Sequence, residues 1–261
     1  MRVDVDLLAR RSRRVEVDDL DLDDFASHPL DPGALRCLRY MHDVEHHTVC
    51  YLRDLLLTEA HRDPEITTFL TVWVYEEHWH GEALAAVLAA HGEGAGGARV
   101  AASRQRSRRH DLAMSLAMAA ANGVTRHLPA LHMTWGAVNE CLTQAAYRRL
   151  AARADHPVLS ELVDRISRQE GRHIDFYAGQ AERRLAASPR ARRLTRAALG
   201  RLWTPVGAGI MPAAEVRHLG RHLFGGDEGR AAVARIDRRV QRLPGLDGLT
   251  VVGDALDRLA A

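Results

Sequence analysis

The chain has 261 residues, of which 46% are hydrophobic and 27% charged, and its formal net charge is +2 with the histidines neutral. This composition supplies a folded core, and the nearly balanced charge gives no overall attraction to nucleic acid or to an anionic membrane. Three widely spaced cysteines, none in a CxxC pair, argue against a disulfide framework and favour a reducing compartment. The beginning of the chain lacks a signal-peptide pattern, and the longest apolar runs are about half as long as a bilayer-spanning helix requires. We therefore expect a cytoplasmic protein without membrane insertion and without a nucleic-acid partner.

In chain order, the sequence predicts a charged arm followed by helices. Residues 1–30 alternate basic and acidic blocks, which indicates an extended or loosely ordered arm. Alternating β-branched and aromatic runs are nearly absent, and helical periodicity dominates instead. The long predicted helices cover residues 33–58, 64–91, 99–121, 128–153 and 157–186.

Turn-forming residues set the expected helix ends. Asp63 is expected to cap the second helix, with Pro64 in its first turn, and Asn122–Gly123 to end the third. The sequence thus predicts an all-α fold with an N-terminal arm over 1–30, a helical bundle over 31–190 and a helical C-terminal segment over 191–261 packed on the same domain.

Glutamates and histidines interrupt the apolar faces of four predicted helices. In the second helix, for example, steps of three and four residues place Glu77 and His80 in line with Phe69, Trp73 and Leu84. The full set that faces the core consists of Glu45, Glu77, His80, Glu140, Glu170 and His173. Four buried carboxylates would repel one another or take up protons, whereas two divalent metal ions would balance their charge.

The spacing of these residues is specific. Glu-x-x-His places both side chains on one helical face, one turn apart. One glutamate on each of two helices and a Glu-x-x-His pair on each of two others is the arrangement of ferritin-like di-iron or di-manganese proteins. Oxygen and imidazole ligands suit iron or manganese. The alternative is a set of buried polar residues without metal. The pattern therefore predicts a ferritin-like four-helix bundle with additional helices.

The remaining polar clusters receive less specific interpretations. A third Glu-x-x-His pair, Glu215 and His218, falls off its apolar stripe and is interpreted as a solvated surface pair. His46, His47 and His78 are expected at the surface or around the ligands. A basic cluster forms either a solvated face or a docking patch for an acidic carrier protein or reductant; it comprises Arg104, Arg106, Arg108 and Arg109.

Four segments resemble the ligand helices of soluble acyl-acyl carrier protein desaturases, in particular their actinobacterial branch. These segments are "MHDVEHHTVCY", "YEEHWHGEAL", "NECLTQAAYRRLA" and "SRQEGRHIDFY". The third includes a Glu-x-x-Thr that places Thr143 beside the metals. The resemblance spans roughly residues 20–190, and the C-terminal tail resembles that of bacterial members.

The resemblance implies an oxidase with two iron ions, or manganese, and O2 as co-substrate. Glu45 and His80 would bind one ion and Glu140 and His173 the other, with Glu77 and Glu170 bridging them. Thr143 would help to handle protons during the removal of hydrogen from an unactivated C–H bond of an acyl chain. The substrate would arrive on an acyl carrier protein, the electrons would come from a ferredoxin-type donor, and the protein would be a homodimer.

One departure and several alternatives accompany this expectation. The family usually has Asp where this chain has Gln169, so the partner of a ligand histidine differs, and Asp175 is a candidate replacement. The alternatives are a di-iron N-oxygenase or hydroxylase acting on a carrier-bound specialised metabolite, and a non-enzymatic ferritin-like metal-binding protein or metal-free scaffold. Leu84, where ribonucleotide reductase small subunits usually carry a radical tyrosine, argues against that class.

Overall fold

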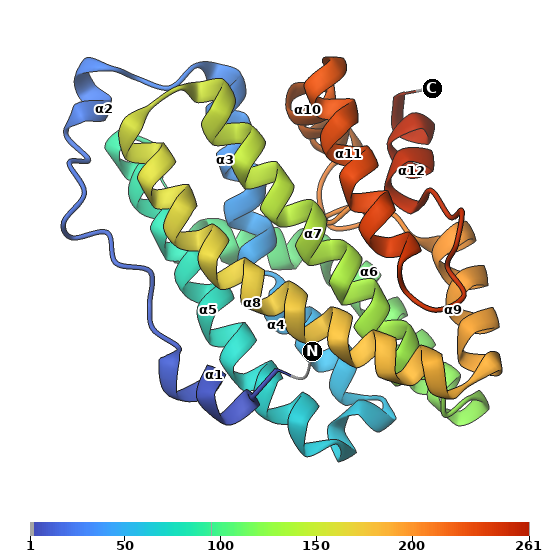
Figure 1. The fold of residues 1–261 in the computed structure, drawn as a ribbon. Helices are drawn as coiled ribbons and strands as arrows, with labels where there is room; N and C mark the ends of the chain where they lie inside the picture. The colour runs from blue at the N-terminus through green and yellow to red at the C-terminus, as the bar shows by residue number, and fades with distance from the viewer. Residues whose placement is uncertain (1–2, 95, 261) are drawn as a thin grey trace.

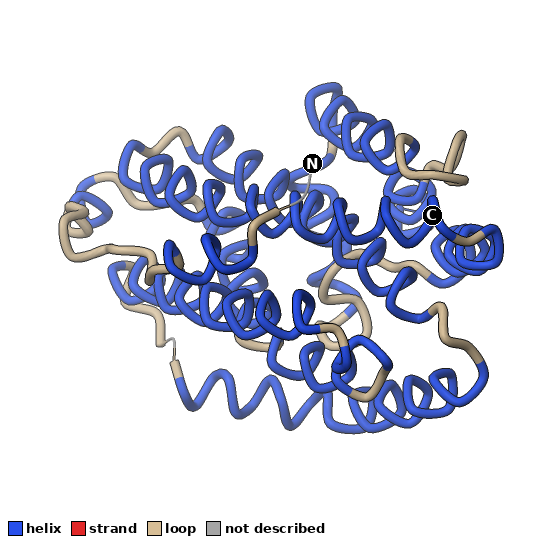
Figure 2. Tube along the Cα trace, turned by 60° about the horizontal axis from the view of Figure 1, so that its bottom comes forward, coloured by secondary structure: helices blue, strands red, loops and turns tan. Residues whose placement is uncertain are grey.

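Helices make up most of the protein. The computed structural model describes residues 3–94 and 96–260, and Figures 1 and 2 show that its elements are helices joined by loops. Within these residues the only β-type pairing is an isolated bridge between Ala208 and Met211. The elements are α1 (Val5–Arg11), α2 (Asp24–Ser27), α3 (Pro32–Glu45), α4 (Thr48–Leu56), η1 (Glu59–Arg62), α5 (Pro64–Ala90), α6 (Gly97–Val124), α7 (Leu128–Ala154), α8 (Pro157–Ala187), α9 (Pro189–Leu202), α10 (Ala213–Phe224), α11 (Gly226–Gln241) and α12 (Val251–Ala260). The expected all-α class is confirmed.

The helices α3, α5, α7 and α8 form a bundle. They run side by side in Figure 1. Among the described residues, α7 and α8 are the two elements with the most extensive contact. The turn between these two is tight, because Asp155 adopts a left-handed conformation with φ of 47° directly after α7. The bundle encloses a large apolar core in which Phe69, Tyr147 and Phe176 are almost completely buried. Burial of this apolar surface is the main force that holds the four helices together.

The start of α5 follows the sequence prediction. The Asp63 carboxylate accepts hydrogen bonds from the amides of Glu65 and Ile66 at 3.0 and 3.3 Å, and Pro64 occupies the first helical position. This cap takes up amides that the first helical turn leaves without partners. It fixes the register of α5, and with it the inward direction of Glu77 and His80.

The first predicted helix, 33–58, is in fact two helices. Between α3 and α4 the backbone tightens, since the amide of His47 bonds to the carbonyl of Val44 and the amide of Cys50 to that of His47, three residues back in each case. The Thr48 hydroxyl also donates to the Glu45 carbonyl at 2.6 Å. Such a side-chain bond competes with the helical ladder. The break falls directly after Glu45, and the apolar pattern alone does not indicate it.

The third predicted helix ends later than expected. α6 continues through Asn122 and Gly123 to Val124. The Asn122 side chain accepts a hydrogen bond from the Glu59 amide at 3.0 Å, and so joins α6 to η1. Asn122, which the sequence predicts to end the helix, therefore lies within the helix and makes a tertiary contact.

Both ends of the described chain pack on the bundle. The arm is expected over residues 1–30, and its described part, residues 3–30, is more ordered than the charge pattern predicts, because α1 lies against α5 and the side chains of Val5, Leu8 and Phe25 are buried. On the opposite side in Figure 1, α10 contacts α3 and α7, and α11 contacts α7. The apolar core is continuous with both ends. None of the helices in the described ranges is long and apolar enough to cross a membrane.

Candidate metal centre

The six predicted ligand residues meet in the middle of the bundle. Glu45 is the last residue of α3, and the Glu-x-x-His pairs lie near the centres of α5 and α8. Glu140 occupies the middle of α7. All six residues are buried, at 5% exposure or less. The four helices thus bring four carboxylates and two imidazoles into one interior volume.

These side chains form two overlapping groups. One group contains Glu45, Glu77, His80 and Glu170, and in it one potential ligand atom from each residue lies within 4.8 Å of all the others. The second group satisfies the same condition and contains Glu77, Glu140, Glu170 and His173. Glu77 and Glu170 therefore belong to both groups. This partition, with two shared carboxylates, could hold two adjacent cations.

The inward-facing atoms have no hydrogen-bond partners. Nδ1 of His173 lies 3.2 Å from Glu77 Oε1 and 3.4 Å from Glu170 Oε2, and Nδ1 of His80 lies 3.4 Å from Glu170 Oε1. None of these nitrogen atoms, nor Glu77 Oε1, nor either Glu170 oxygen, has hydrogen-bond geometry to any group. Buried polar atoms without partners are costly. Divalent cations among them would accept their lone pairs and neutralise their charge, so the donor set fits a pair of metal ions.

The outward nitrogen of each histidine is held by a specific acceptor. Nε2 of His173 lies 2.8 Å from Glu76 Oε2, and Nε2 of His80 lies 2.9 Å from Gln169 Oε1. A proton held on Nε2 leaves the lone pair of Nδ1 directed at the centre, as a metal ligand requires. Glu76, which leaves the apolar stripe in sequence, is completely buried and also accepts from Arg172 at 2.8 Å.

Gln169 is held in place as the acceptor for His80. Its amide nitrogen donates to the Arg13 carbonyl at 2.9 Å, which orients its oxygen towards His80. Asp175 does not take this role, since its side chain is 54% exposed and pairs with Arg239. The N-terminal arm therefore supports a histidine of the central cluster through one intervening side chain.

Two aromatic side chains bind the outer carboxylates, and sequence reasoning missed both. Trp73 Nε1 donates to Glu140 Oε1 at 3.0 Å, and the Tyr147 hydroxyl donates to Glu45 Oε1 at 2.5 Å. In the sequence, Trp73 lies on the apolar stripe of its helix, and no polar contact is predicted for Tyr147. Their available signal was position, because Trp73 lies one turn before Glu77 and Tyr147 two turns after Glu140 on the same helical faces.

Burial and neighbouring charges shift the pKa values of the clustered carboxyl groups in different directions. Burial raises the pKa of Glu45, and burial together with the neighbouring carboxylates raises the pKa of Glu77 and Glu140 well above its usual range. Burial acts in the same direction on Glu170, but the imidazoles of His173 and His80 lower its pKa. Burial alone would lower the pKa of His173, and the carboxylates beside it raise it well above its usual value. Cations that enter this site must therefore displace protons.

Thr143 lies beside the cluster rather than inside it. Its half-buried side chain lines a pocket of about 40 Å³ that also reaches Glu45. The other walls come from α3, α7, α10, α12 and residues 205–206, and they are almost entirely apolar, as with Met41, Leu142 and Phe224. The pocket thus offers apolar surface next to one carboxylate of the cluster.

The other polar clusters of the sequence lie outside this centre. Glu215 pairs with Arg36 through two contacts of 2.7 and 2.8 Å and is 30% exposed, away from the six ligands. In the basic cluster, Arg104 donates to the His46 carbonyl at 3.0 Å and Arg106 lies 3.8 Å from Asp43, and both have exposed side chains. Two smaller groups contain the remaining candidate ligands; they are His46 with His78 and Glu82, and His47 with Cys50 and Asp111.

Comparison with protein-family models, with curated proteins and with solved structures gives no match to this chain.

Proposed function

We propose that this chain is an oxygen-dependent di-iron oxidase that desaturates an acyl chain bound to an acyl carrier protein. The observation that carries the proposal is the pair of buried groups that share Glu77 and Glu170 and whose inward atoms have no hydrogen bonds. A structural network of buried polar residues would satisfy these atoms within the protein. The choice of iron, and of desaturation among di-iron reactions, rests on the sequence resemblance.

In this proposal the four helices hold two irons at fixed positions. Glu45 and His80 would hold one ion, Glu140 and His173 would hold the other, and Glu77 and Glu170 would be available to both. When bound, the irons supply the activation of O2 that oxidation of an unactivated C–H bond requires. The protein keeps the imidazoles in the ligating tautomer through Glu76 and Gln169.

The pocket beside Glu45 is the proposed substrate position. Its apolar walls would exclude water and hold a hydrocarbon segment next to the metal cluster. Thr143 and Glu45 line the same pocket, so the threonine hydroxyl is placed to hold or pass a proton between bound substrate and the carboxylates. We assign Thr143 this proton-handling role.

The size of the pocket favours a second candidate function. Its volume of about 40 Å³ is small, so a long acyl chain requires the walls to open. A hydroxylase or N-oxygenase acting on a compact carrier-bound metabolite needs less opening. Analysis of products formed from candidate carrier-bound substrates with ferredoxin, reductant and O2 separates a double bond from an added oxygen atom.

The partners belong to the same proposal. The exposed guanidinium groups of Arg108 and Arg109 on α6 offer positive charge to an acidic carrier protein or ferredoxin. Leu112 and Leu116, on the same helix, are 62% and 64% exposed. Exposed leucines one turn apart are typical of a face that another subunit covers, which supports the proposed homodimer.

Metal analysis after anaerobic reconstitution with Fe2+ tests the core of the proposal. We expect at least two irons per chain, together with O2-dependent turnover of a carrier-bound substrate. A preparation that retains far less than two metals per chain after reconstitution contradicts the di-iron assignment. Two irons without any oxidation of substrate would instead support a ferritin-like metal-binding protein.

A further inference from the structure

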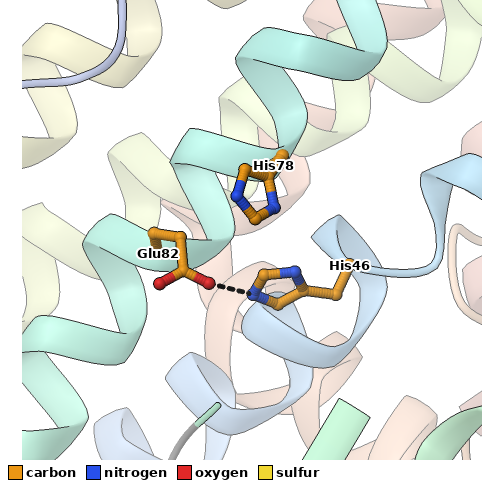
Figure 3. A group of neighbouring side chains, drawn as sticks. All are labelled: His46, His78 and Glu82. Atoms are coloured by element: carbon orange, nitrogen blue, oxygen red, sulfur yellow. Dashed lines mark ion pairs between the residues drawn. The ribbon is translucent and has the colours of Figure 1, made fainter. Parts of the chain in front are cut away.

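A second group of potential metal ligands lies on the outer side of the contact between α3 and α5. His46 comes from the break between α3 and α4, whereas His78 and Glu82 come from α5. Figure 3 shows the His46 ring directed at the face of α5 that carries the other two side chains. One ligand atom from each residue lies within 4.8 Å of the others.

The three residues converge because of local structure. His78 and Glu82 are four residues apart on α5 and so share one face of the helix. His46 approaches this face across Gly81, where an added Cβ atom would lie only 2.6 Å from His46 Nε2. Only a residue without a side chain leaves room for the ring there. The glycine and the helix break together bring the imidazole into reach of both side chains.

His46 is buried, and its Nε2 atom has no hydrogen bond. The residue is 8% exposed, and Nε2 lacks a hydrogen-bond partner although it lies 3.5 Å from Glu82 Oε1. Ligands about 2.1 Å from a tetrahedral metal are separated by roughly 3.4 Å, so this distance fits two ligands of one ion. The Glu82 side chain is 43% exposed and His78 is exposed, which leaves the position open to solvent.

In the group around His47, Nδ1 of His47 also lacks a hydrogen bond, but the other imidazole nitrogen is paired with a carboxylate. His47 Nε2 lies 3.0 Å from Asp111 Oδ1, and the second oxygen of Asp111 accepts from Ser107 at 2.8 Å. These ligand atoms are already paired within the protein. The buried pair joins the α3–α4 junction to α6 and requires no ion.

We infer that His46, His78 and Glu82 form a separate, solvent-accessible binding site for one divalent transition-metal ion. Two imidazoles and one carboxylate with open positions suit Zn2+, Fe2+ or Mn2+ rather than Ca2+ or Mg2+. The site is distinct from the buried centre, although Glu45 and Glu77 precede two of its ligands in the chain. The inference does not depend on the proposed oxidase function.

Equilibrium dialysis against Zn2+ tests the site. We compare the wild-type protein with His78→Ala, and with His28→Ala as a control whose side chain is 72% exposed and lies outside the group. We expect the wild type and the control to bind one more zinc ion per chain than His78→Ala. If the buried centre also binds zinc, the difference of one ion remains, so failure of either site is recognised separately.

A second variant, Glu82→Gln, retains the shape of the side chain and removes its charge. We expect it to weaken zinc binding at this site by more than roughly 10-fold, because loss of a ligand exceeds the usual effect of a residue that only supports one. Equal zinc stoichiometry and affinity in the wild type, His78→Ala and Glu82→Gln would overturn the inference. Circular dichroism of each variant establishes that the helices are retained.

Discussion

At the residue scale, the acidic residues that interrupt the apolar helix faces in the sequence lie together in the interior of the protein. Glu77 and Glu170 lie on apolar stripes, and the structure places both at the centre of the cluster with unpaired oxygens. Helical spacing predicted that the six ligand residues face inward, but it did not predict the burial of Glu76, which leaves the apolar stripe. The side chains that surround them were harder to predict. Trp73 and Tyr147 resemble ordinary core residues in the sequence, and only the structure shows which carboxylates their polar atoms bind.

The raised carboxyl pKa values predict an unusual pH dependence for the metal-free protein. A carboxyl group whose pKa is higher in the folded state binds more protons there than in the unfolded chain, so its contribution to stability falls as pH rises above the unfolded value. Glu140→Gln removes one such group. We expect the free energy of unfolding of Glu140→Gln to rise relative to wild type between about pH 5 and pH 8.

Chemical denaturation of both proteins in the presence of a chelator measures this difference. The sign is opposite to that of a salt-bridged carboxylate, whose removal becomes more damaging as pH rises. If the difference in the free energy of unfolding stays constant over this pH range, or if Glu140→Gln becomes less stable than wild type as pH rises, the pKa of Glu140 is not raised in the folded protein.

The same variant should lose more than about 100-fold in turnover, because it removes a proposed ligand of one iron.

The hydrogen bond from His80 to Gln169 leads to a prediction about metal affinity. Gln169→Ala should weaken metal binding in the central site by about 10- to 100-fold, since the imidazole loses the acceptor that orients it. Gln144→Ala is the matched control, because Gln144 donates to the Ser167 carbonyl and contacts no proposed ligand. Competition with a chromophoric chelator gives both affinities. Equal affinities would mean that Gln169 plays no part in orienting His80.

At the element scale, caps and periodicity predicted the long helices well, whereas one local side-chain bond and several tertiary contacts decided the rest. Asp63 and Pro64 set the start of α5 from local chemistry alone. The break after Glu45 coincides with a local bond from the Thr48 hydroxyl, and the extension of α6 with a tertiary contact between Asn122 and η1. The apolar pattern indicates neither contact. The order of the N-terminal arm likewise depends on its contact with α5, which a charge pattern does not reveal.

The close approach of α7 and α8 gives a prediction about stability. An added Cβ atom on Gly136 would lie 2.4 Å from Tyr177 Cε1, so Gly136→Ala should destabilise the protein by about 1–3 kcal/mol through overpacking. In Gly220→Ala, on α10, the nearest atom would be at an ordinary 3.5 Å, and the better helix propensity of alanine should leave stability unchanged or raise it. Urea denaturation distinguishes the two variants. Equal stability would show that the helices separate readily at Gly136.

At the scale of the whole molecule, apolar residues remain on the outer face of α6. Leu112→Glu combined with Leu116→Glu should convert the proposed dimer into a monomer, because burial of four carboxylates at a two-fold interface is unfavourable. Leu7→Glu, at a leucine that is 43% exposed on α1, is the control and should remain dimeric. Sedimentation velocity measures the mass of each. A wild-type protein that sediments as a monomer contradicts the proposed dimer.

The four bundle helices surround one buried cluster of carboxylates and imidazoles, and the proposed function requires metal ions within this cluster. Anomalous diffraction at the iron edge, from crystals of the reconstituted protein, locates the ions directly. We predict two peaks between α3, α5, α7 and α8, one beside Glu45 and His80 and the other beside Glu140 and His173, with Glu77 and Glu170 in contact with both. A map without iron peaks among these six residues would contradict the account.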